Sequence, residues 1–199
     1  GLECRYDFMR RSVRMSTRAD NAENAAIPAR HVVLVMFDGA EAIDVAGAAS
    51  VFSKAEQMRP GAYRLHLASP DGGDVATNSA LVIRGTKPFA QLPPRIDTLV
   101  VAGGDEGPMR AAIRNPRITQ WLSRVAPATR RIASVCSGAF ALAAAGLLDG
   151  RQATTHWSAL DLLQRMRPSI EVRRDRIYVR DERVWTSAGV VTCIELALA

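Results

Sequence analysis

The stretch Arg131-Ile132-Ala133-Ser134-Val135-Cys136-Ser137-Gly138-Ala139-Phe140 decides the fold of this chain. Its first five residues are mostly apolar and include β-branched side chains, which predicts a buried strand over 131–135. Small residues follow, and the apolar run over 138–147 predicts a helix. The segment therefore consists of a strand, a sharp turn with Cys136 at its apex, and a helix.

The same order of strand, turn and helix recurs along the chain. Uninterrupted apolar runs at 31–37 and 97–102 are typical of strands that are buried on both faces of a parallel sheet. Alternating strands and helices predict a flavodoxin-like three-layer α/β/α sandwich with a mostly parallel central sheet. The other expected strands cover 63–69, a hairpin within 75–83, 152–155 and two strands within 170–185, and the expected helices cover 40–58, 109–114, 117–125, 158–166 and a last helix from about 188.

Composition excludes several classes of protein. With 199 residues and 48% hydrophobic side chains, the chain can bury one core, while its richest apolar run, 139–148, is shorter than the roughly 20 residues of a membrane helix. We expect a cytoplasmic protein that does not associate with membranes. The three cysteines show no CxxC spacing, which argues against a disulfide framework or a zinc ribbon. No metal and no cofactor are expected.

The two ends of the chain differ from its centre. Residues 1–30 are poor in apolar side chains and predict a disordered leader, so that the folded domain is expected over 31–199. The apolar run at 194–199 has no Gly or Pro after it, which predicts a last helix that is truncated. The net charge of +6 includes scattered arginines, and the segment 165–183 mixes both signs, which indicates a solvated face rather than a nucleic-acid site.

Chemistry is expected where the parallel strands end. Cys136 follows such a strand, and the helix after it would direct its free amides at the sulfur, which predicts a lowered thiol pKa. The backbone amides of Ser137 and of Gly103 or Gly104 are candidates for an oxyanion hole. An inert buried cysteine is the alternative, but the position of Cys136 at the turn favours a functional thiol.

Two further side chains are candidates for the same edge of the sheet. Asp44 lies one turn into the first helix between apolar neighbours, and it is either a general acid/base beside Cys136 or a solvated or capping residue. His156 follows the strand at 152–155 and is either a base or pocket wall, or a structural histidine beside Trp157. Cys193 lies in an apolar helix, for which the inert interpretation is favoured.

Five ordered motifs resemble the ThiJ/PfpI superfamily, also described as class I glutamine amidotransferase-like. Within it they resemble the branch that contains isonitrile hydratases and the amino-terminal domains of GlxA-type AraC-family transcription regulators. The motifs are Phe37-Asp38-Gly39 with the AIDVAG run at 42–47, VAGG at 101–104, VCSG at 135–138, GLLDG at 146–150 and ATTHW at 153–157.

The resemblance implies roles for two residues. Cys136 would be the cysteine at the nucleophile elbow, the sharp turn between the strand and the helix. Asp44 would be the carboxylate that the family carries on its first helix. In isonitrile hydratases the thiolate would attack the isonitrile carbon, and the carboxyl would shuttle protons. Water would then complete the product, an N-substituted formamide. Ser137 stands where protease-type members carry a histidine, which argues against peptidase or deglycase activity.

Two functions remain, and the first is favoured because the stretch 175–190 looks more like the regulators. It is a ligand-sensing, dimerising domain of a GlxA-type regulator, with a small-molecule ligand, a homodimer, and DNA bound only through a helix-turn-helix region outside this chain. Alternatively, the chain is an isonitrile hydratase-like lyase that uses Cys136 and Asp44.

Overall fold

Parallel pairing between buried strands organises the molecule. The computed structural model describes residues 28–189 and 192–198, so most of the expected leader lies outside the described residues. The main strands are β1 (Arg30–Val35), β2 (Tyr63–Ser69), β3 (Gly73–Ala76), β4 (Val82–Pro88), β5 (Thr98–Val101), β6 (Arg131–Ser134), β9 (Tyr178–Asp181) and β10 (Val184–Ser187). They form one eight-stranded sheet in the order β3-β4-β2-β1-β5-β6-β10-β9. Only the outer pairs β3/β4 and β9/β10 are antiparallel, which confirms the predicted mostly parallel sheet.

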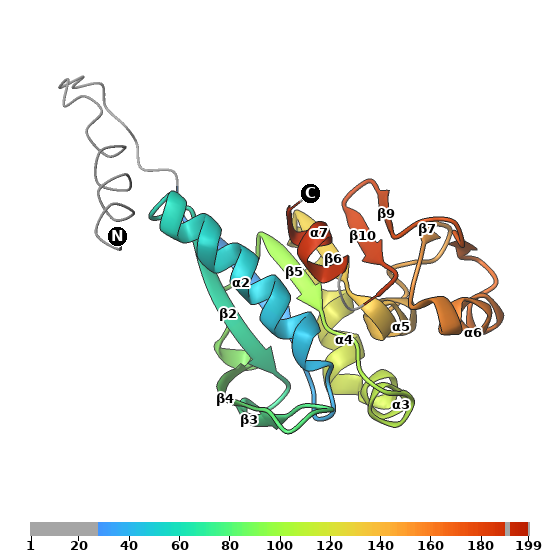
Figure 1. The fold of residues 1–199 in the computed structure, drawn as a ribbon, viewed down its shortest axis with the longest axis horizontal. Coiled ribbons are helices and arrows are strands. Elements are labelled where there is room, and N and C mark those ends of the chain that lie inside the picture. The colour runs from blue at the N-terminus through green and yellow to red at the C-terminus, as the bar shows by residue number, and fades with distance from the viewer. Residues whose placement is uncertain (1–27, 190–191, 199) are drawn as a thin grey trace, which may run out of the picture.

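Helices cover both faces of this sheet (Figure 1). They are α2 (Ala42–Met58), α3 (Glu106–Arg114), α4 (Pro116–Val125), α5 (Ala139–Ala144), α6 (Leu160–Met166) and α7 (Thr192–Leu198). The helices α2 and α7 pack on each other over one face, and α3, α4 and α5 pack together over the other. None of the helices in the described ranges is long and apolar enough to span a bilayer.

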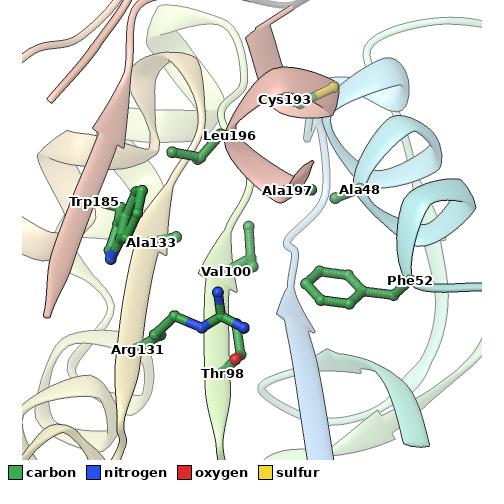
Figure 2. Close-up of a pocket in the computed structure, with 10 residues that line it drawn as sticks. All are labelled: Ala48, Phe52, Thr98, Val100, Arg131, Ala133, Trp185, Cys193, Leu196 and Ala197. Carbon is green, nitrogen blue, oxygen red and sulfur yellow. The ribbon is translucent and has the colours of Figure 1, made fainter. Parts of the chain in front are cut away.

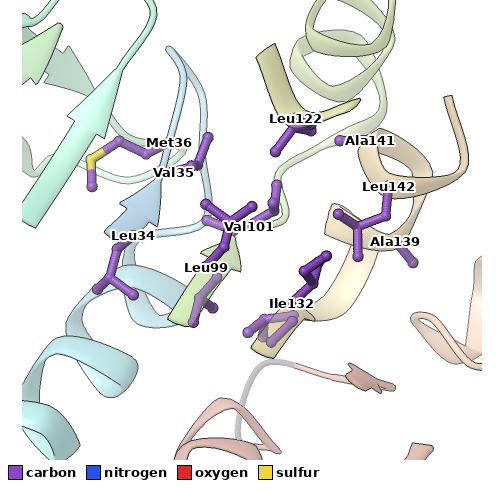
Figure 3. Packing of buried hydrophobic residues seen from close by; sticks show 14 of the residues in the cluster. Leu34, Val35, Met36, Leu99, Val101, Leu122, Ile132, Ala139, Ala141 and Leu142 are labelled. Carbon is purple, nitrogen blue, oxygen red and sulfur yellow. The ribbon is translucent and has the colours of Figure 1, made fainter. Parts of the chain in front are cut away.

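The core lies on both sides of the central strand β5, whose four residues are all buried. Figure 3 shows Leu122 of α4 and Leu142 of α5 reaching toward Val101 and Ile132 of the sheet. On the face below α2 and α7, a cavity of about 30 Å³ has room for little more than a water molecule (Figure 2). Its lining consists of Ala48, Phe52, Thr98, Val100, Arg131, Ala133, Trp185, Cys193, Leu196 and Ala197.

Three elements differ from the sequence prediction. The expected strand at 152–155 is β7 (Gln152–Ala153), which pairs with β8 (Glu171–Val172) in a separate two-stranded ladder. The expected helix at 138–147 is the short α5, preceded by the 3-10 turn η4 (Cys136–Gly138). The last helix, expected from about 188, is described over Thr192–Leu198; Ala188 and Gly189 are not helical, and the two residues between them and Thr192 lie outside the described residues.

Candidate functional site

Cys136 occupies a strained turn at the end of β6. Its φ of +51° lies in the left-handed region, which costs a non-glycine residue about 1–2 kcal/mol. The turn is closed by the Gly138 amide, which donates to the Val135 carbonyl at 2.8 Å. A Cβ on Gly138 would lie 2.4 Å from the Val101 carbonyl oxygen, so only glycine lets the turn pack this tightly against β5. The predicted strand, turn and helix are therefore present, with the thiol at the apex.

Asp44 and Gly103 hold the ends of neighbouring elements together at this turn. The Gly103 amide donates to Asp44 Oδ2 at 2.8 Å, and the Asp44 side chain is 1% exposed. A Cβ on Gly103 would lie 2.9 Å from Asp44 Oδ2, from Cys136 Cβ and from the Ser137 nitrogen. Because Gly103 has no side chain, the carboxyl of Asp44 and the residue Cys136 can approach each other at this point.

The pKa of Asp44 lies close to neutral pH. The pKa of this carboxyl is raised from 3.8 to about 7, chiefly by burial; the charge of Glu41 adds to the rise, and the hydrogen bond from the Gly103 amide opposes it. Asp44 Oδ1 is buried and has no hydrogen-bond partner among the described residues. A carboxyl in this state can both hold and release a proton near pH 7, as a general acid/base requires.

The thiol does not have the predicted lowered pKa. Burial, followed by the charge of Asp44, raises the pKa of Cys136 to about 12, and the hydrogen bond from the Ser137 amide only partly offsets this. The prediction is wrong because the sulfur lies in a buried position, at 8% exposure, and because a 3-10 turn followed by six helical residues replaces a long α-helix. Burial and the charge of Asp44 therefore both favour the protonated thiol of Cys136 at neutral pH.

The expected oxyanion hole is also corrected by the structure. The Gly103 amide is taken by Asp44, and the Gly104 amide donates to the Ser137 hydroxyl at 2.9 Å. That hydroxyl in turn donates to the Gly104 carbonyl at 2.7 Å, so that Ser137 and Gly104 fasten β6 to the loop after β5. Neither glycine amide is free for a ligand, and of the three predicted donors only the Ser137 amide faces the sulfur.

A cleft of about 560 Å³ opens beside the thiol, within the range of small-molecule sites. His156 belongs to its wall, while its Nδ1 lies 2.8 Å from the Ser158 hydroxyl and its ring lies 5.3 Å from that of Trp157. His156 thus lines the cleft and also lies beside Trp157, while its role as a base stays a prediction. The lining consists of Glu41, Gly104, Asp105, Glu106, Met109, Arg110, Ile113, Arg114, Cys136, Ser137, Phe140, His156, Ser158, Ala159, Leu162 and Met166.

Glu41 is a lining residue that sequence reasoning missed. Its carboxylate accepts a hydrogen bond of 2.7 Å from the Asn78 amide group, which lies in the loop between β3 and β4. A contact across 37 residues leaves no local pattern, although Glu41 does lie one helical turn before Asp44. Its position adds a second carboxylate to the thiol end of the cleft.

The remaining histidines and Cys193 lie away from the cleft. His31 and His66 contact each other on β1 and β2, with Nδ1 and Nε2 2.9 Å apart. Cys193 is buried where α7 crosses α2, and a Cβ on Gly47 would lie 2.4 Å from its sulfur. In the part of the chain that the structure describes, no three acidic, histidine or cysteine side chains gather as a metal site would require.

These features define a class of protein: flavodoxin-like α/β domains with a cysteine at the turn after a central strand and a carboxylate on the first helix. The DJ-1/PfpI family model matches residues 30–199, and the chain belongs to that family. Among solved structures it is similar to a ThiJ/PfpI family protein from Pseudomonas syringae, with a TM-score of 0.77 and 24% identity over 92% of this chain and 72% of that one. It is also similar to an AraC family transcriptional regulator from Pseudomonas putida, with a TM-score of 0.74 and 22% identity over 85% and 89%.

This chain matches three curated relatives over different shares of their lengths. An "uncharacterized protein in cpoL 5'region" of Streptomyces lividans is 43% identical over 69% of this chain and 95% of its own. The HTH-type transcriptional regulator CdhR of Pseudomonas aeruginosa is 35% identical over 68% of this chain, which spans only 39% of CdhR. The isonitrile hydratase of Pseudomonas putida is 30% identical over 85% of this chain and 70% of the enzyme.

Substituting Asp44 with Asn should change how stability depends on pH. Because the folded pKa is raised, the folded protein retains a proton that the unfolded chain releases, and stability is lost as the pH rises from about 3.8 to about 7. Asp44→Asn has no such loss. Its free energy of unfolding relative to wild type should therefore increase between pH 4 and pH 8, by on the order of 4 kcal/mol.

Urea unfolding at four pH values measures this difference. Asp105→Asn is the matched control, since Asp105 is an exposed carboxylate that makes no capping hydrogen bond. A difference between Asp44→Asn and wild type that stays flat with pH would contradict the assignment.

Adding a methyl group at Gly103 should destabilise the site, because three atoms lie 2.9 Å from the new Cβ. Overpacking of this kind costs roughly 1–3 kcal/mol. Gly107→Ala in α3 is the control, because a Cβ at this position would have no atom within 4 Å and alanine favours a helix. In chemical denaturation, Gly103→Ala should therefore lower the free energy of unfolding, and Gly107→Ala should raise it. Equal free energies for the two variants would refute the tight packing around Gly103.

Proposed function

We propose that this domain senses a small molecule and dimerises as part of a GlxA-type AraC-family transcription regulator. The observation that carries the proposal is a cleft of about 560 Å³ beside a thiol whose pKa is raised to about 12. A sensor needs a shaped pocket but no thiolate, whereas a cysteine nucleophile acts as the thiolate. The HTH-type relatives support this function, and we propose a cytoplasmic protein whose DNA contacts lie in a helix-turn-helix region outside these 199 residues.

Isonitrile hydration is the second candidate, and the state of Asp44 favours it. The thiolate would add to the isonitrile carbon, and the carboxyl of Asp44, with its pKa of about 7, would protonate that carbon. Water would then add to the resulting thioimidate, the C–S bond would break, and an N-substituted formamide would leave with the nitrogen protonated. This cycle requires Cys136 to lose its proton in a site that disfavours the thiolate.

Incubation with an alkyl isonitrile separates the two candidates. Formamide production is followed by mass spectrometry with wild-type protein and with Cys136→Ala. The sensor proposal expects no turnover above the buffer rate in either sample. Multiple turnovers by wild type that Cys136→Ala abolishes would overturn the sensor proposal in favour of the hydratase.

An exposed apolar surface supports the proposed homodimer. We define it by Ile43 on α2, Ile194 on α7, and Leu81 and Val82 at the β3–β4 hairpin, which are all at least 41% exposed. These elements are neighbours, because the Cys193 sulfur contacts the Ile43 carbonyl at 3.5 Å and the hairpin's Asn78 amide bonds the Ala40 carbonyl at 3.0 Å. A second copy of the chain would cover this surface.

Placing a charge on this surface should therefore dissociate the dimer. Ile43→Arg is expected to shift sedimentation from a dimer to a monomer at micromolar concentration, because an unpaired charge is costly in an apolar interface. Met58→Arg is the matched control, since Met58 lies at the other end of α2 and is 87% exposed. A dimer that survives Ile43→Arg, or a wild-type monomer, would contradict the proposed interface.

A further inference from the structure

The cleft beside Cys136 is lined by two helices, α3 and α6, and the loops that lead into both helices are fastened to the turn that carries the thiol. The loop that leads into α3 is fastened to the elbow by the Gly104 amide on the Ser137 hydroxyl. The loop that leads into α6 is fastened by the Thr155 hydroxyl, which donates to the Cys136 carbonyl at 2.9 Å. At about 1.5 Å per residue, α3 carries the wall roughly 12 Å from Glu106 to Arg114.

The middle of the cleft is apolar. Met109 and Ile113 lie one turn apart on α3, and Leu162 and Met166 lie one turn apart on α6. All four line the cleft, so the two helices present apolar stripes to the same space. Leu162 is 44% exposed, which leaves apolar surface for a ligand to cover.

The charges along the cleft are separated by sign. Glu41 and Glu106 line it near the start of α3, close to the buried Asp44. Arg114 lines it at the far end of α3, and Arg110 one turn earlier is already paired with Glu106. Within the described residues, Arg114 makes no ion pair and no side-chain hydrogen bond. A negatively charged group is therefore repelled at the thiol end and can be paired at the Arg114 end.

From this arrangement we infer that the ligand of the cleft is an elongated amphipathic anion. Its apolar chain or ring would lie between the stripes of α3 and α6, and its single carboxylate would pair with Arg114. The inference rests on the proposed ligand-sensing function and deepens it by naming the class of ligand.

Three probes of equal chain length test the inference by calorimetry: octanoate, octan-1-ol and octyltrimethylammonium. Octanoate should bind roughly tenfold tighter than either of the others, as a charge-assisted contact allows. Acetate and butanoate should bind progressively more weakly than octanoate, because they cover less of the apolar stripes.

Two variants assign the contacts. Arg114→Gln should weaken octanoate roughly tenfold and leave octan-1-ol unchanged. Arg124→Gln is the matched control, because Arg124 is the basic residue in the last turn of α4 as Arg114 is in α3, but lies outside the cleft. Leu162→Asn removes apolar surface without adding a charge, at a position that is 44% exposed, and it should reduce the binding of octanoate and of octan-1-ol alike.

Each contrary result overturns the inference in a defined way. Tighter binding of octyltrimethylammonium or octan-1-ol would refute the anionic ligand while leaving a ligand-binding cleft in place. Equal effects of Arg114→Gln and Arg124→Gln would refute the contact with Arg114, and no binding of any probe at millimolar concentration would refute the inference as a whole. The proposed sensor function fails by a separate result, which is isonitrile turnover that depends on Cys136.

Discussion

The hydrogen bond from the Gly103 amide to the buried Asp44 carboxyl joins the parts of the chain on which the site depends. Asp44 belongs to the helix after β1, Gly103 follows β5, and Cys136 follows β6, which are neighbours in the sheet. Their closeness requires that Gly103 has no side chain, since a Cβ there would lie 2.9 Å from each of three atoms. The parallel sheet brings the three loops to one edge, and this contact fixes how they meet.

The same packing determines the electrostatics of the site. Asp44 and Cys136 are both largely removed from solvent, at 1% and 8% exposure, so both groups favour their neutral forms. A negative charge on Asp44 also raises the pKa of Cys136, because two negative charges would lie close together in a buried region. A protonated thiol next to a carboxyl that titrates near pH 7 suits a pocket that recognises a ligand, and it places a barrier before nucleophilic attack.

Much of the fold could be predicted from the sequence, because it depends on local patterns. The apolar runs that became β1 and β5, and the strand, turn and helix around Cys136, carry their periodicity in consecutive residues. The family resemblance of the motifs at 42–47, 101–104 and 135–138 is confirmed by the family match over 30–199. The separate ladder of β7 and β8 could not be predicted, because it is set by pairing between residues about 20 positions apart.

The sequence could predict that Cys136 and Asp44 lie close together, as the structure places them, but it could not predict the pKa values of these groups or the hydrogen bonds around them. Spacing indicates that Cys136 and Asp44 share an edge of the sheet, but it does not indicate how deeply the sulfur is buried or that Ser137 and Asp44 take the two glycine amides. The contribution of Glu41 depends on Asn78, which is distant in sequence.

The state of the thiol is thus the central claim, and a pH titration of wild-type protein labelled with ¹³C at the cysteine β-carbon tests it most directly. The Cys136 resonance should keep the chemical shift of a protonated thiol from pH 6 to pH 10, because burial and the Asp44 charge raise the pKa of this group to about 12. Any inflection within this range would contradict the account, and one below about 8.5, the ordinary pKa of a free cysteine, would favour a reactive thiolate.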